Sequence, residues 1–165
     1  MTSSAIAVNL SGQSALVTGA SSGIGAAVAE ALATNGALVW VNHPDEASTD
    51  AAAAVVSRIT SAGGKAQAIQ ADVSCEADVL AMFQEIEGAG LDILVNNAGI
   101  AHSSPIEEMA VHDFDRLFAV HVRGTFLCTR SALKIMYPQN SGRIINTASQ
   151  LAYILSLIHI SEPTD

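Results

Sequence analysis

The chain has 165 residues, half of them hydrophobic, so it is long enough to bury one substantial core and too short for two ordinary domains. Its net charge of −9, with only seven Lys and Arg residues, argues against nucleic acid or an anionic membrane surface as a partner. The N-terminus lacks a secretory signal and no apolar stretch is long enough to span a bilayer, so we expect a cytoplasmic protein.

Short apolar runs alternate along the chain with longer stretches of helical spacing. Strands are predicted over residues 14–18, 37–41, 66–71, 93–96 and 143–147. Helices are predicted over residues 24–34, 47–61, 77–87 and 113–136, with the last one ended by Pro138. This alternation predicts an α/β fold, a Rossmann-like doubly wound parallel sheet with helices on both faces. Cys75 and Cys128 lie far apart without metal-ligand spacing, and we expect no metal site.

The first predicted strand runs into a glycine-rich turn, TGASSGIG, at residues 18–25. Gly19, Gly23 and Gly25 precede a helical stretch directly, and this is the context that a dinucleotide-binding turn requires. Glycines let the backbone approach a pyrophosphate, whose charge is then stabilised by free amides and the positive end of the helix dipole. The spacing Gly-x-x-x-Gly-x-Gly differs from the more familiar Gly-x-Gly-x-x-Gly.

Together with NNAG at residues 96–99, this turn resembles that of the classical short-chain dehydrogenases/reductases. The resemblance extends to Asp72-Val73 after the third strand and to IINTAS at residues 144–149. It implies an NAD(P)-binding domain with a pyrophosphate turn at Gly19, Ser21, Ser22, Gly23, Ile24 and Gly25, adenine contacts at Asp72 and Val73, and a ribose wall at Asn97, Ala98 and Gly99. It also implies that Ser149, at a strand end, hydrogen-bonds the substrate oxygen.

Structural alternatives exist for several of these residues. Asp72 could instead cap the helix that follows it. Asn96 and Asn97 could be turn residues that satisfy neighbouring backbone groups, a role compatible with the functional one. Ser149 by itself would be an ordinary polar residue at the end of a strand.

The choice between NAD and NADP depends on the end of the second strand, where an acidic residue binds ribose hydroxyls and a cation accepts a 2′-phosphate. Asn42 would not repel a phosphate, and His43 could pair with one when protonated. These two residues favour NADP over NAD weakly. The alternative for His43 is a solvated loop histidine.

The sequence departs from the family at two places. His121 in AVHVRGTF stands where the family usually has an asparagine that holds a water chain for proton relay. The family's catalytic tyrosine is expected thirteen residues after Ser149, where this chain has Glu162. Tyr153 has the wrong spacing and is followed by Leu157 where the lysine of Tyr-x-x-x-Lys should be.

The run LSLIHISEPT at residues 155–164 does not continue the family pattern and resembles the translation of a sequencing-library adapter. We therefore expect residues 1–154 to be an incomplete NAD(P)-binding domain, truncated after the fifth strand, and residues 155–165 to be a non-native tail. The alternative is a natural, divergent C-terminus.

The resemblance implies an NAD(P)-dependent oxidoreductase that interconverts an alcohol and a ketone by hydride transfer. We expect the chain as printed to be inactive, because the Tyr-x-x-x-Lys segment is missing. Alternatives are a catalytically silent dinucleotide-binding module and a truncated fragment without function. The expected partner is a small-molecule alcohol or ketone, and we expect the full-length parent to form a homodimer or homotetramer.

Overall fold

The computed structural model describes residues 8–149, so the tail predicted at residues 155–165 lies outside the described residues. Five strands form one sheet: β1 (Ser14–Val17), β2 (Leu38–His43), β3 (Lys65–Gln70), β4 (Ile93–Asn96) and β5 (Arg143–Asn146). Each overlaps a predicted strand, with bounds that differ by two residues at most.

The helices between the strands are α1 (Gly23–Thr34), α2 (Thr49–Ser61), α3 (Glu76–Glu87), α4 (Val111–Phe118) and α5 (Thr125–Gln139). A 3-10 turn, Glu46–Ser48, precedes α2 where the sequence predicts the start of a single helix. Asp45 caps this turn, because its side chain accepts a hydrogen bond from the amide of Ser48.

The prediction of one continuous helix over residues 113–136 is wrong. A π-helical segment, Ala119–Gly124, separates α4 from α5. A wider π turn inserts one extra residue into the helical path, and such turns are frequent at functional sites. Here the hydroxyl of Thr125 donates to the carbonyl of His121 at 2.7 Å, which satisfies an acceptor inside the distorted turn.

Pro138 does not end α5, contrary to expectation, because the helix continues to Gln139. Asn140 ends it in the left-handed conformation, with φ at 51°. Its amide and that of Ser141 donate to the carbonyls of Tyr137 and Met136, which closes the last turn.

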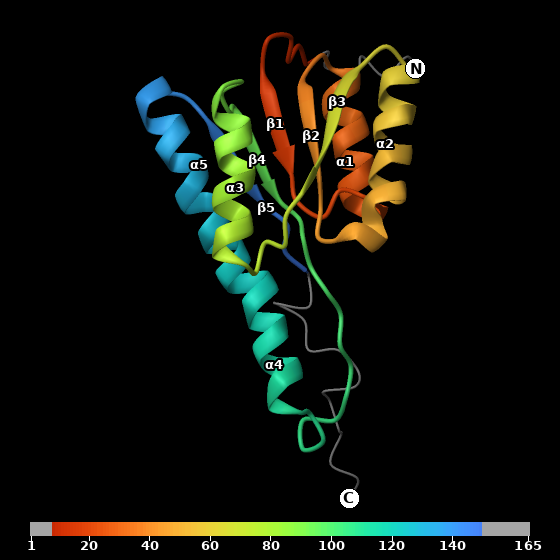
Figure 1. Cartoon of the computed structure of the whole chain (residues 1–165), viewed down its shortest axis with the longest axis vertical. Coiled ribbons are helices and arrows are strands. Elements are labelled where there is room, and N and C mark those ends of the chain that lie inside the picture. Colours follow the sequence, from red (N-terminus) through yellow and green to blue (C-terminus); the bar gives the residue numbers. More distant parts are fainter. Residues whose placement is uncertain (1–7, 150–165) are drawn as a thin grey trace, which may run out of the picture.

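All four strand pairings are parallel, in the order β3-β2-β1-β4-β5. Figure 1 shows α1 and α2 on one face of the sheet and α3 and α5 on the other, with α4 extending past the carboxyl ends of the strands. This confirms the predicted Rossmann-like doubly wound sheet. In the described part of the chain, no helix is long and apolar enough to cross a membrane.

Strand residues alternate between two apolar cores, as the pleat of a sheet requires. Leu16 and Leu94 pack under α3 and α5, whereas Val17 and Val95 pack under α1 and α2. β1 and β4 are therefore buried on both faces. The chain order reverses at the β1/β4 pair, and ligands bind open α/β sheets outside the carboxyl ends of strands at such a reversal.

Candidate active site

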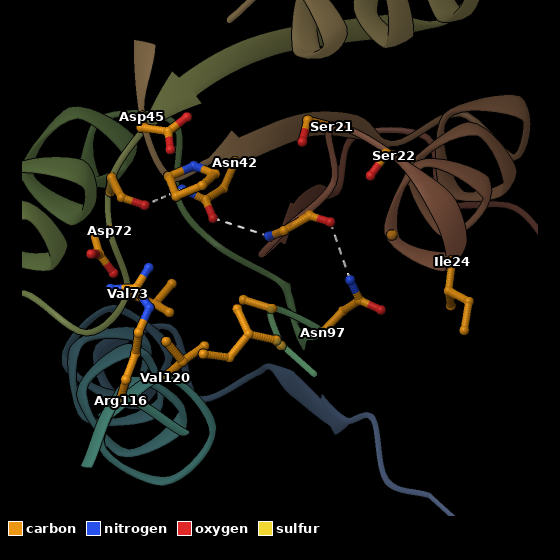
Figure 2. A pocket seen from close by; sticks show the side chains of 17 residues that line it. Ser21, Ser22, Ile24, Asn42, Asp45, Asp72, Val73, Asn97, Arg116 and Val120 are labelled. Carbon is orange, nitrogen blue, oxygen red and sulfur yellow. Dashed lines mark hydrogen bonds between the residues drawn. The ribbon is translucent and has the colours of Figure 1, made fainter. Parts of the chain in front are cut away.

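A pocket of about 410 Å³ opens at the carboxyl edge of the sheet, beside the β1/β4 pair. Figure 2 shows its lining side chains, which come from the loops after β1, β2, β3 and β4 and from the α4 segment. The predicted residues that line it together are Gly19, Ser21, Ser22, Ile24, Gly25, Asn42, Asp72, Val73, Asn97, Ala98 and Gly99. Elements far apart in the sequence thus bring the predicted turn and the two predicted walls into one cavity.

Steric demands explain two glycines of the turn. Gly19 has φ at +62°, and a Cβ built there would lie 2.8 Å from the Cα of Ala98. A Cβ at Gly25 would lie 2.4 Å from the carbonyl oxygen of Gly19 and 2.6 Å from the side-chain nitrogen of Asn97. The turn is therefore packed against the loop after β4 more closely than any side chain allows. Gly23 does not line the pocket, although its φ of +55° also suits glycine.

The N-terminus of α1 points its first amides toward this turn. Ser22 is the N-cap, yet its side chain makes no capping hydrogen bond, and the first turn of α1 contains no acidic residue. Uncapped amides and the helix dipole together attract an anion. Ser22 and Ile24 line the pocket, so this N-terminus fits the pyrophosphate of a dinucleotide.

Asn42 holds the turn from the side of β2. The residue is 1% exposed, its Oδ1 accepts a hydrogen bond from the amide of Gly19 at 3.1 Å, and its Nδ2 donates to the carbonyl of Ala71 at 3.0 Å. One amide side chain thus ties β2 to the loops after β1 and β3. Asn42 borders the pocket mainly as a structural clamp.

Thr18 and Asn97 join the turn to the loop after β4. The Thr18 hydroxyl accepts hydrogen bonds from the amides of Asn97 and Ala98, each at 3.0 Å. The side-chain nitrogen of Asn97 donates to the Thr18 carbonyl, also at 3.0 Å. Asn96 faces the other neighbour and donates to Asn146 of β5 at 2.9 Å. Asn97 therefore has the backbone-satisfying role expected for the pair, whereas the Asn96 side chain bonds the side chains of Thr129 and Asn146 instead.

Asp72 does not cap α3, because the N-cap of that helix is Cys75. Its Oδ1 accepts hydrogen bonds from the amide and the hydroxyl of Ser74, at 2.9 and 2.7 Å, and this fixes the turn after β3. Val73 is nearly buried, and a Cβ at Gly124 would lie 2.8 Å from its Cγ2. The second wall of the pocket is thus held against the π-helical segment.

His43 is neither a solvated loop residue nor part of the pocket lining. It is the last residue of β2, is 4% exposed, and its Nδ1 lies 3.0 Å from the carbonyl oxygen of Asp45. This contact ties the ring to the loop after β2. The expected pairing of His43 with a phosphate has no support in this geometry.

His121 lies in the π-helical segment and does not line the pocket, but it contacts the loop that does. Its Nε2 lies 2.8 Å from the carbonyl oxygen and 3.2 Å from the amide nitrogen of Ile100. The ring is also tight against Gly99, where a Cβ would lie 2.7 Å from Cε1. His121 thus positions the segment that follows NNAG.

Ser149 is exposed and lies three residues beyond the end of β5, on the same carboxyl side of the sheet as the pocket. It is not among the residues that line the cavity. The segment predicted to contain the tyrosine position, including Tyr153, Leu157 and Glu162, lies outside the described residues.

The sequence prediction missed several pocket residues, above all Asp45 and Arg116. Asp45 could have been found, because it stands twenty residues after Gly25, where a Rossmann fold places the acid that binds ribose. Hydrogen bonding to Ser48 lowers the pKa of Asp45 below its usual range. Arg116 comes from α4, and no motif predicts that this helix reaches the cavity.

Residues 13–158 of the chain match the short chain dehydrogenase family. The chain is 44% identical over 142 residues to a 3-oxoacyl-[acyl-carrier-protein] reductase of Synechocystis, covering 85% of this chain and 57% of the relative. A short-chain type dehydrogenase/reductase of Mycobacterium marinum superposes with a TM-score of 0.85 at 39% identity, covering 90% of this chain and 60% of that structure.

The angucycline C-6 ketoreductase LanV, solved with bound NADP, has a TM-score of 0.82 at 39% identity, with 90% of this chain and 60% of that one covered. The chain thus spans less than two thirds of the length of these relatives. The family match agrees with the glycine-rich turn, the NNAG segment and the parallel sheet. The chain belongs to the short-chain dehydrogenase family of oxidoreductases, which bind a nicotinamide dinucleotide on a Rossmann-like fold.

Proposed function

We propose that the pocket binds a nicotinamide dinucleotide and that the protein interconverts an alcohol and a ketone. The main observation behind this proposal is the N-terminus of α1, which has no side-chain cap and lies beside the glycine-rich turn from Gly19 to Gly25, called here the cradle. Within the lining, polar and backbone groups suited to a pyrophosphate lie at one end and the Asp72-Val73 wall lies at the other. The names of the reductases and dehydrogenases to which the chain is similar support the same reaction class.

The residues that would hold the dinucleotide fall into three groups. Ser21, Ser22 and the first amides of α1 would bind the pyrophosphate. Asp72 and Val73 would border the adenine, and Ala98 with Gly99 would border the sugar that leads to the nicotinamide. When bound, the nicotinamide supplies or accepts the hydride.

The chain's own contribution to the chemistry is positioning and polarisation. Ser149 would donate a hydrogen bond to the substrate oxygen, and His121 would hold the loop at Ile100 through its Nε2. The printed sequence contains no Tyr-x-x-x-Lys, so it lacks the tyrosine–lysine pair that would exchange the proton of the carbinol oxygen. Loss of a general acid costs roughly 10²- to 10⁴-fold in rate, so we expect the 165-residue chain to bind the dinucleotide and turn over little.

Binding and turnover measured side by side test this proposal. The 165-residue chain is titrated with NADH and NADPH by fluorescence, while ketone reduction is followed by the loss of dinucleotide absorbance. Saturable binding with little turnover is the expected result. Binding with no reduction by a longer chain that includes a Tyr-x-x-x-Lys segment would favour the silent binding module instead. A folded chain that binds neither dinucleotide would refute the proposal.

A further inference from the structure

We propose that Asp45 makes this pocket selective for NAD(H) against NADP(H), an inference that rests on the proposed dinucleotide binding. The sequence favours NADP weakly through Asn42 and His43, but neither side chain is available in the structure to meet a phosphate. The Asn42 amide is engaged with Gly19 and Ala71, and the His43 ring is buried outside the pocket lining. Asp45 is the charged side chain that the loop after β2 presents instead.

Asp45 lies at the end of the cavity where the adenosine of the dinucleotide would bind. It follows β2 by two residues, and Figure 2 shows its carboxylate on the same side of the pocket as Asp72, away from Ser22 and Ile24. Ser22 and Ile24 belong to the pyrophosphate turn. In Rossmann folds the ribose of the adenosine lies near the end of the second strand, where an acid accepts hydrogen bonds from its hydroxyls.

A network of short contacts fixes the Asp45 carboxylate. Its Oδ1 accepts hydrogen bonds from the amide of Ser48 at 3.0 Å and from the Ser48 hydroxyl at 2.7 Å. His43 holds the backbone carbonyl of Asp45 at 3.0 Å from its Nδ1. Within residues 8–149, all hydrogen bonds to this carboxylate go to Oδ1, which leaves Oδ2 able to accept a bond from a ligand. The group is therefore preorganised rather than free to turn away.

The negative charge of Asp45 favours the binding of NAD(H) and disfavours the binding of NADP(H). The Ser48 hydrogen bonds lower the pKa of Asp45, so the carboxylate is ionised at neutral pH. An ionised carboxylate accepts strong hydrogen bonds from ribose hydroxyls. The 2′-phosphate of NADP replaces one of those hydroxyls with negative charge, which the exposed Asp45 carboxylate repels.

Arg116 is the charged group that could oppose this preference. It is the one cation in the pocket lining, it is exposed on α4, and it makes no ion pair within the described residues. Figure 2 draws its guanidinium beside Asp72 and Val73, whereas Asp45 lies above them, nearer to Asn42 of β2. A 2′-phosphate placed at the end of β2 would thus meet the carboxylate rather than the guanidinium.

The test compares the affinities of NADH and NADPH for the 165-residue chain and three variants, by calorimetric titration after circular dichroism has shown that each is folded. Asp45→Asn keeps an Oδ1 that accepts the Ser48 bonds but removes the charge. Glu46→Gln removes the neighbouring charge, which does not line the pocket. Arg116→Leu removes the opposing cation.

We expect the unaltered chain to bind NADH about tenfold or more tightly than NADPH, which corresponds to about 1.4 kcal/mol. Asp45→Asn should raise the affinity for NADPH about tenfold, Glu46→Gln should leave the ratio unchanged, and added salt should shrink the difference because it screens the repulsion. Equal or tighter binding of NADPH by the unaltered chain would overturn the inference. So would an Asp45→Asn ratio equal to that of the unaltered chain, or an Arg116→Leu variant that loses NADPH affinity alone. Failure to bind either dinucleotide would refute the proposed function itself.

Discussion

The side-chain oxygen of Asn42, near the end of β2, accepts a hydrogen bond at 3.1 Å from the amide of Gly19, which follows the neighbouring strand β1. The same side chain donates to the carbonyl of Ala71, so three loops at the carboxyl edge of the sheet meet at one buried amide. The shape of the pyrophosphate turn therefore depends on a residue outside the glycine motif.

Asn42→Ala should lower the free energy of unfolding by about 1–3 kcal/mol, because it leaves the partly buried amide of Gly19 and the buried carbonyl of Ala71 without their partner. Asn9→Ala is the control, since within residues 8–149 the exposed Asn9 side chain bonds only to the nearby Ser11 amide. Denaturant unfolding of both variants measures the difference. Equal losses of stability in the two variants would show that the Asn42 hydrogen bonds do not stabilise the fold.

Gly19→Ala should destabilise the chain more than Gly12→Ala does. Both glycines have positive φ, at +62° and +83°, so both substitutions strain the backbone. At Gly12 a Cβ has open space, whereas at Gly19 it would lie 2.8 Å from the Cα of Ala98. Overpacking costs typically about 1–3 kcal/mol, and thermal unfolding should show that difference between the two variants. A larger loss at Gly12 would contradict the packing described for the turn.

Much of the fold could be predicted from the sequence, because strands, helices and turns follow from the pattern of neighbouring residues. Apolar runs such as Leu94 with Val95 indicate strands covered on both faces, and the glycine spacing locates the first turn and α1. The break between α4 and α5 could not be predicted, since helical spacing continues across it. The tertiary contacts of His121 with Ile100 and of Gly124 with Val73 accompany the π-helical segment there.

The site residues could be predicted where they belong to a recognisable sequence motif. The residues of the glycine turn and of the NNAG loop meet in the pocket, because their positions follow from strand ends. The environment of His43 could not be predicted, since burial depends on packing between β2 and the loop after it. Arg116 was missed for the same reason, as it reaches the cavity from a distant helix.

His121→Ala should loosen the loop after NNAG. The Nε2 contact with Ile100 disappears in this variant, so the Ile100 amide should exchange with solvent several-fold faster. His112→Ala, at an exposed histidine of α4, should leave that exchange unchanged. Hydrogen exchange followed by mass spectrometry measures both, and unchanged protection of residues 99–101 in His121→Ala would refute the positioning role.

The two cysteines should differ in reactivity. Burial raises the pKa of Cys128 to about 12, from an ordinary value of 9.0, whereas Cys75 is partly exposed. At neutral pH an alkylating reagent should modify Cys75 alone in the folded chain and both in denaturant. Because the Cys128 thiol ionises more readily when unfolded, its contribution to stability is full below pH 9 and is lost as the pH rises toward 12. Alkylation of Cys128 at the rate of Cys75 in the native chain would contradict its burial.

We propose that a stripe of exposed apolar residues on α4 and the following segments lies between copies of the chain in an oligomer. The stripe consists of Phe114, Phe118, Val122 and Phe126, spaced four residues apart, and the first two rings contact each other at a tilt of 34° with centroids 4.5 Å apart. Exposed apolar patches of this kind mark interaction surfaces. Phe118→Asp should shift a dimer or tetramer toward monomer in sedimentation experiments, whereas Val8→Asp, on the N-terminal side of β1, should not. An unchanged mass for Phe118→Asp would refute the interface.

The central claim is that the cradle between Gly19 and Gly25 binds a nicotinamide dinucleotide, and a calorimetric titration of NADH tests it most directly. The unaltered chain should bind saturably at one site. Gly25→Ala should abolish that binding, because its Cβ would lie 2.4 Å from the Gly19 carbonyl oxygen, while Gly88→Ala, where a Cβ has open space, should bind as before. A folded, unaltered chain that gives no binding heat and no change in NADH fluorescence, or a Gly25→Ala variant that binds equally well, would contradict it.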